Sequence, residues 1–111
     1  MACLYERIDN DMRRIRNTII EMNFDNATVI SSKLLDSLIA ALNYSHSLVQ
    51  KIRYIPNVRK VSAKELQHEL YIVSILVDDF YQLSILTDTL YENLKRTLSM
   101  LLKHVYSLLT K

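Results

Sequence analysis

Apolar residues recur every three or four positions along most of the chain, which is the spacing of α-helices that bury one face. Short breaks divide the pattern into four rows and predict helices at about residues 5–22, 29–55, 63–82 and 86–109. The rows are Ile8, Met12, Ile15, Ile19 and Met22; Leu35, Leu38, Leu42, Ser45, Val49 and Ile52; Leu66, Leu70, Val73, Val77 and Phe80; and Leu86, Leu90, Leu94, Leu98, Leu101, Val105 and Leu108. We therefore expect an all-α fold, a small antiparallel bundle of about four helices in a single domain spanning residues 1–111.

Two local signals place the ends of the middle helices. Pro56 disfavours the helical conformation of the residue before it, so the second helix is expected to end at Ile55. The segment Ser62-Ala63-Lys64-Glu65 has the form of a capping box, and Val61 and Leu66 are spaced to pack as a hydrophobic staple beside it. The third helix is therefore expected to begin directly after Ser62.

The break between the third and fourth rows has a weaker sequence signal. Ser84 or Thr87 has the side chain needed to cap a new helix. A single helix over residues 63–109 would be roughly 70 Å long, which is improbable in a compact monomer. A break near residues 82–88 is therefore favoured.

Glycine is absent from the 111 residues, and there is a single proline. Glycine enters positive φ more freely than any other residue, so tight hairpin turns, phosphate-binding loops and dinucleotide-binding fingerprints depend on it. The composition therefore argues against a hairpin-rich β fold, a P-loop and a Rossmann site.

Cysteine usage and hydropathy indicate a cellular compartment. The single cysteine, Cys3, has no partner in the chain for a disulfide, which fits a reducing environment. No charged segment followed by an apolar run, as in a signal peptide, opens the chain. The longest uncharged run, residues 37–50, is too short and too polar to cross a bilayer. An intracellular, cytoplasmic protein without a membrane span is expected.

Residues with catalytic or metal-binding chemistry do not form a recognisable set. Glu65-x-x-His68 matches half of a carboxylate di-iron motif, but the chain lacks the second Glu-x-x-His that such a site requires. Cys3 lies near the chain terminus, where no base is fixed beside it. We therefore expect no catalytic site, no metal site and no cofactor.

Charge is unevenly distributed, although the formal net charge is only +2. Residues 51–64 carry basic charges only, and residues 71–94 carry acidic charges only. The basic residues are Lys51, Arg53, Arg59, Lys60 and Lys64, and the acidic ones are Asp78, Asp79, Asp88 and Glu92. A solvated loop and helix face explain this pattern, and the alternative is a patch that binds phosphate or an acidic partner. The small net charge argues against nucleic acid as a partner, but the basic patch leaves it open.

Residues 70–87 are apolar on nearly all sides of the predicted helix, interrupted by Asp78-Asp79. A helix of this kind needs more neighbours than a four-helix bundle supplies, so self-association, with a dimer favoured, or a protein partner is expected. The interface candidates lie off the main apolar row and are Tyr71, Ile75, Tyr81 and Ile85. The function that these features favour is a non-enzymatic interaction module, a regulator or scaffold that docks an apolar helix face on itself or on a partner.

The N-terminal third resembles a known enzyme family. The pattern Thr28-Val29-x-x-Ser32-x-x-Leu35-Asp36-x-Leu38-Ile39, with Ile8-Asp9 and Asn23-Phe24 upstream, is similar to the aspartyl-phosphate phosphatases that act on sporulation response regulators. The resemblance implies a helical hairpin and a role for Ser32 and Asp36 in dephosphorylating a response regulator. The sequence departs from the family motif Ser-Gln-Glu-Leu-Asp, because Lys33 and Leu34 replace the Gln and Glu.

A second resemblance is to the histone fold. A short helix precedes a middle helix of about 27 residues, and the segment Arg59-Lys60-Val61-Ser62-Ala63-Lys64-Glu65-Leu66 is similar to the second loop of histone-fold proteins. It implies a subunit of a nucleoprotein complex that pairs through its middle helix. Pro56 and the long helical region that follows residue 66 depart from that pattern.

Overall fold

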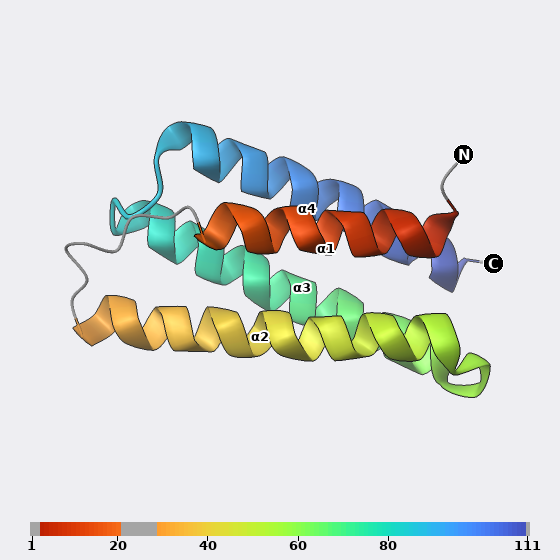
Figure 1. Cartoon of the computed structure of the whole chain (residues 1–111). Coiled ribbons are helices and arrows are strands. Elements are labelled where there is room, and N and C mark those ends of the chain that lie inside the picture. The colour runs from red at the N-terminus through yellow and green to blue at the C-terminus, as the bar shows by residue number, and fades with distance from the viewer. Residues whose placement is uncertain (1–2, 21–28, 111) are drawn as a thin grey trace.

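The computed structural model describes residues 3–20 and 29–110. Its elements are α1 (Leu4–Ile20), α2 (Val29–Tyr54), a 3-10 turn η1 (Pro56–Val58), α3 (Arg59–Gln82) and α4 (Asp88–Leu109). Consecutive helices run in opposite directions, so that α1 begins where α4 ends (Figure 1). The expected all-α antiparallel bundle is confirmed, while the predicted end of the first helix at residue 22 lies outside the described residues.

The four helices surround one apolar core. Helix α3 packs between α2 and α4, and α1 packs mainly on α4 and least closely on α2. The predicted rows supply most of the core, because residues spaced by three and four lie on one side of a helix. Their buried members are Ile8, Met12, Ile15, Ile19, Leu38, Leu42, Ser45, Val49, Ile52, Leu66, Leu70, Val73, Val77, Phe80, Leu86, Leu94, Leu98, Leu101, Val105 and Leu108.

The start of α3 differs from the prediction. The helix begins at Arg59, so Ser62 lies one turn inside it and is buried rather than acting as an N-cap. The physical reason is Pro56, which begins the 3-10 turn that leads directly into the helix. Val61 is exposed, so the predicted hydrophobic staple does not form. The prediction of a capping box at Ser62 was wrong.

The break between α3 and α4 falls in the expected interval. It is made by a residue in the left-handed conformation, a position that glycine usually occupies. Ser84 has φ of 60°. The N–H of Ser84 donates to Tyr81 O at 3.0 Å, and the N–H of Ile85 donates to Phe80 O at 3.1 Å. This is the hydrogen-bond pattern of a Schellman motif, with serine in the left-handed position. Thr87 then caps α4, accepting the Leu90 N–H at 3.2 Å through its hydroxyl.

Replacing Ser84 by glycine is expected to stabilise the protein. A residue with a Cβ costs roughly 1 kcal/mol in the left-handed region, and glycine avoids most of that penalty. Ser84→Gly should therefore raise the free energy of unfolding, measured by urea denaturation, by up to about 1 kcal/mol. The matched control is Ser99→Gly on the exposed face of α4, where glycine should destabilise by a similar amount. A loss of stability in Ser84→Gly would contradict this account of the turn.

Candidate interaction surface

Two of the four predicted interface residues lie side by side on the outer face of α3. Tyr71 is 56% exposed and Ile75 is 61% exposed. They are four residues apart, so they occupy neighbouring positions on one helix face. The opposite face of α3 is buried between α2 and α4, which leaves the Tyr71 face turned to solvent. Val61 is exposed in the same row, within the first turn of the helix.

Exposed tyrosines widen this face onto the two neighbouring helices. Tyr44 of α2 is exposed, and its hydroxyl donates to Glu65 Oε2 of α3 at 2.6 Å. Tyr106 of α4 is exposed and shares a shallow hollow with Tyr71 and Leu102. Tyr44 and Tyr106 were not predicted as interface residues, although each lies off its own helix's buried row. We call this surface, comprising Tyr44, Val61, Tyr71, Ile75 and Tyr106, the α3 face.

The other two predicted interface residues have contacts within the chain. The Tyr81 ring stacks on the Tyr91 ring with centroids 4.0 Å apart. Its hydroxyl donates to Asp88 Oδ1 at 2.6 Å, so Tyr81 ties the end of α3 to the start of α4. Ile85 follows the left-handed Ser84 and packs partly buried against the core. The structure therefore brings Tyr71 and Ile75 together on the α3 face and places Tyr81 in the last turn of α3 and Ile85 in the α3–α4 connection.

A polar network beside the stacked tyrosines joins α3 to α4. Asp78 accepts a hydrogen bond from the Tyr91 hydroxyl at 2.6 Å and pairs with Lys95 Nζ at 3.0 Å. Lys95 also donates to Ser74 Oγ at 2.7 Å. Partial burial alone would raise the pKa of Asp78, but the hydrogen bonds from Tyr91 and Lys95 and the lysine charge outweigh it and hold that pKa below its usual value. The carboxylates of Asp78 and Asp88 raise the pKa of Tyr91 and Tyr81 through the hydrogen bonds that they accept.

The network predicts a pH effect. The folded-state pKa of Asp78 lies below the unfolded value, so its contribution to stability is present above about pH 4 and is lost as the pH falls through the folded-state pKa. Tyr91→Phe removes one hydrogen bond to the ionised carboxylate and should raise the pKa of Asp78, measured by NMR titration of its carboxyl carbon. Tyr106→Phe, an exposed tyrosine of the same helix, is the control and should leave that titration unchanged. An identical Asp78 titration in Tyr91→Phe and the native protein would contradict the assignment.

The predicted basic patch has an inner and an outer part. Arg59 is half-buried: its Nε donates to Ile52 O at 2.8 Å, and its guanidinium lies 5.1 Å from the Tyr5 ring centroid. Arg53 lies over the Tyr54 ring at 5.3 Å. The exposed members are Lys51, Lys60 and Lys64, of which the last two belong to the first six residues of α3. Because Asp78 and Asp79 lie in the last turns of the same helix, α3 is basic at its start and acidic at its end.

The residues of the phosphatase resemblance lie on α2 and are not part of the α3 face as defined above. Ser32 and Asp36 are both exposed near the start of α2, four residues apart on one side of the helix. The proposed role of these two residues stays a prediction, as does the histone-fold resemblance. Within residues 3–20 and 29–110, no three histidine, cysteine or acidic residues gather in a way that would hold a metal ion. No helix in the described ranges is both long and apolar enough to span a membrane.

Comparison of the chain with protein-family models, with curated proteins and with solved structures finds no match. Its function is therefore inferred from its own surfaces.

Proposed function

We propose that the protein is a non-enzymatic interaction module that docks its α3 face onto the same face of a second copy. The observation that carries the proposal is the arrangement of α3, with exposed Tyr71 and Ile75 near the middle, basic side chains at its start and acidic ones at its end. A helix with this order of charges is complementary to itself when two copies run antiparallel.

The symmetry of such a dimer fixes which residues meet. In a two-fold contact the same surface is used on both copies, so each contact between two different residues occurs twice. An antiparallel pair centred between Tyr71 and Ile75 places Tyr71 of each copy against Ile75 of the other. In this register Lys64 of each copy lies within one helical turn, about 4.5 Å along the axis, of Asp79 of the other, a separation that the lysine side chain can span. Asp78 is already paired with Lys95 within its own chain, which leaves Asp79 as the carboxylate for this contact.

The width of the surface also supports a dimer. A stable interface of standard size buries about 800 Å² on each partner, more than one row of side chains on a single helix supplies. Tyr44 on α2 and Tyr106 on α4 extend the α3 face across three helices. Tyrosine is enriched in interfaces because its ring buries a large apolar area while its hydroxyl keeps a hydrogen-bond partner.

Sedimentation equilibrium of the full chain tests the proposal. We expect a reversible monomer–dimer equilibrium at micromolar concentration. The dimer should weaken as salt is raised, because ions screen the Lys64–Asp79 pairs at the rim, where Lys64 is exposed and Asp79 is half-buried in the single chain. A mass that stays monomeric up to millimolar concentration at low salt would overturn the proposal.

A further inference from the structure

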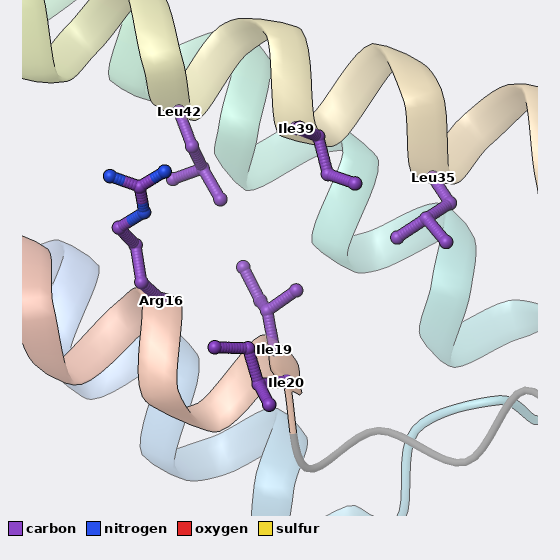
Figure 2. A pocket seen from close by; sticks show the side chains of 6 residues that line it. All are labelled: Arg16, Ile19, Ile20, Leu35, Ile39 and Leu42. Atoms are coloured by element: carbon purple, nitrogen blue, oxygen red, sulfur yellow. The ribbon is translucent and has the colours of Figure 1, made fainter.

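An apolar groove lies between α1 and α2, which pack on each other less closely than the other neighbouring helices do. Figure 2 shows Ile19 and Ile20 reaching into it from α1, and Leu35, Ile39 and Leu42 lining it from α2. The cavity has a volume of about 350 Å³, which is within the usual range for small-molecule sites, about 300–1,000 Å³. Its size and lining fit a small apolar ligand.

The groove leaves large aliphatic side chains in water. Ile20 is 79% exposed and Ile39 is 43% exposed. Single exposed aliphatic side chains are common, but here two converge on one cavity whose remaining apolar walls belong to Ile19, Leu35 and Leu42. Covering these side chains with hydrocarbon would remove them from water at a favourable free energy.

Among the described residues that line this groove, the only charged one lies at one end. Arg16 lines the cavity beside Leu42, at the end away from Leu35 (Figure 2). Its guanidinium donates to Asn43 Oδ1 at 2.7 Å, which fixes the side chain at the rim. In the part of the chain that the structure describes, no carboxylate lines the cavity and none forms an ion pair with Arg16. Because guanidinium binds carboxylate through charge-assisted hydrogen bonds, this end of the groove is complementary to an anionic head group.

We propose that the α1–α2 groove binds a medium-chain alkyl carboxylate, with the carboxylate on Arg16 and the alkyl chain along Ile19, Ile39 and Leu35. The groove favours a thin chain over a partner helix, because its wall on α2 spans Leu35 to Leu42, about 10 Å of helix. A helix with its side chains is itself about 10 Å across and is usually longer than this wall. This site is separate from the α3 face and does not depend on self-association.

Titration calorimetry with hexanoate, octanoate and decanoate, each below its micelle-forming concentration, tests the site. Affinity should rise about fourfold for each added methylene group that enters the groove. Octanoate should bind about tenfold more tightly than octanol, because only the carboxylate pairs with Arg16. The absence of saturable decanoate binding would overturn the proposal.

Variants separate the head-group contact from the chain contact. Arg16→Gln should lose the preference for octanoate over octanol and leave octanol binding unchanged. Arg14→Gln removes the same charge from the same helix, but Arg14 lines hollows on the α4 side, so this control should bind as the native protein does. Ile39→Asn should weaken the binding of octanoate and of octanol by a similar factor. Equal losses of octanoate affinity in Arg16→Gln and Arg14→Gln would show that only the overall charge of the protein matters. That result would contradict the assignment of the carboxylate to Arg16.

Discussion

Ile75→Glu is expected to convert the proposed α3-face dimer into a monomer without unfolding the chain. Ile75 lies at the centre of the α3 face, and the two-fold axis places two copies of any substitution in one interface. Each glutamate would lose the apolar contact and bring a charge into a desolvated position without a partner, which is strongly unfavourable. The dissociation constant of the dimer should rise by about a hundredfold or more. Sedimentation equilibrium measures this shift, and far-UV circular dichroism checks that the helices remain.

The matched control for this change is Ile20→Glu. Ile20 is also an exposed isoleucine, but it lies at the end of α1 on the α1–α2 groove. This variant should dimerise as the native protein does. Unfolding of Ile75→Glu would place Ile75 in the monomer core, and equal loss of the dimer in both variants would remove the link to the α3 face; either result contradicts the account.

His104→Leu is expected to cause a large loss of stability. Within the described ranges, Asp11 of α1 is the only buried charged residue, with 4% of its surface exposed. Its Oδ2 lies 2.9 Å from Nδ1 of His104 on α4, so the pair joins the first and last helices. Removing the imidazole leaves a buried carboxylate without this partner, and the free energy of unfolding should fall by about 2–4 kcal/mol. That is a large share of a typical total of about 5–15 kcal/mol.

A double-mutant cycle separates this pairing from lost packing. Asp11→Leu together with His104→Leu removes both polar groups, so urea denaturation should show most of the lost stability restored. His46→Leu, at an exposed histidine on α2, is the control and should change stability little. If the losses of unfolding free energy in the two single variants simply added in the double variant, the proposed pairing of Asp11 with His104 would be contradicted.

The helical rows were predictable because they depend on local spacing alone. Residues such as Leu66, Leu70 and Val73 repeat at helical intervals, and all three are buried as expected. The start of α3 was not predicted correctly. The residues Ser62 to Glu65 have the pattern of a capping box, but the same residues also fit a helix interior when a turn beginning at Pro56 starts the helix upstream. The break before α4 was predicted in position, but nothing in the sequence shows that Ser84 adopts the left-handed conformation.

The α3 face was predictable only in part, because its composition depends on which helices become neighbours in the fold. Tyr71 and Ile75 share one helix, so their common face follows from their spacing. Tyr44 and Tyr106 join that face only because α2 and α4 flank α3. Asp11 and His104 are 93 residues apart, and no local pattern links them. Tyr81 has the spacing of an interface residue, but its stacking on Tyr91 depends on the turn at Ser84.

The most direct test of the antiparallel α3 contact uses two charge-reversal variants, Lys64→Glu and Asp79→Lys. In either variant alone, both rim contacts of the dimer bring like charges together, so each protein should dimerise roughly tenfold more weakly than the native chain. In a mixture, every Glu introduced at position 64 of one copy meets a Lys introduced at position 79 of the other, and the two native side chains also meet. Native mass spectrometry of an equal mixture should therefore show mainly heterodimers. A statistical mixture of dimers, or no dimer in the mixture, would contradict the account.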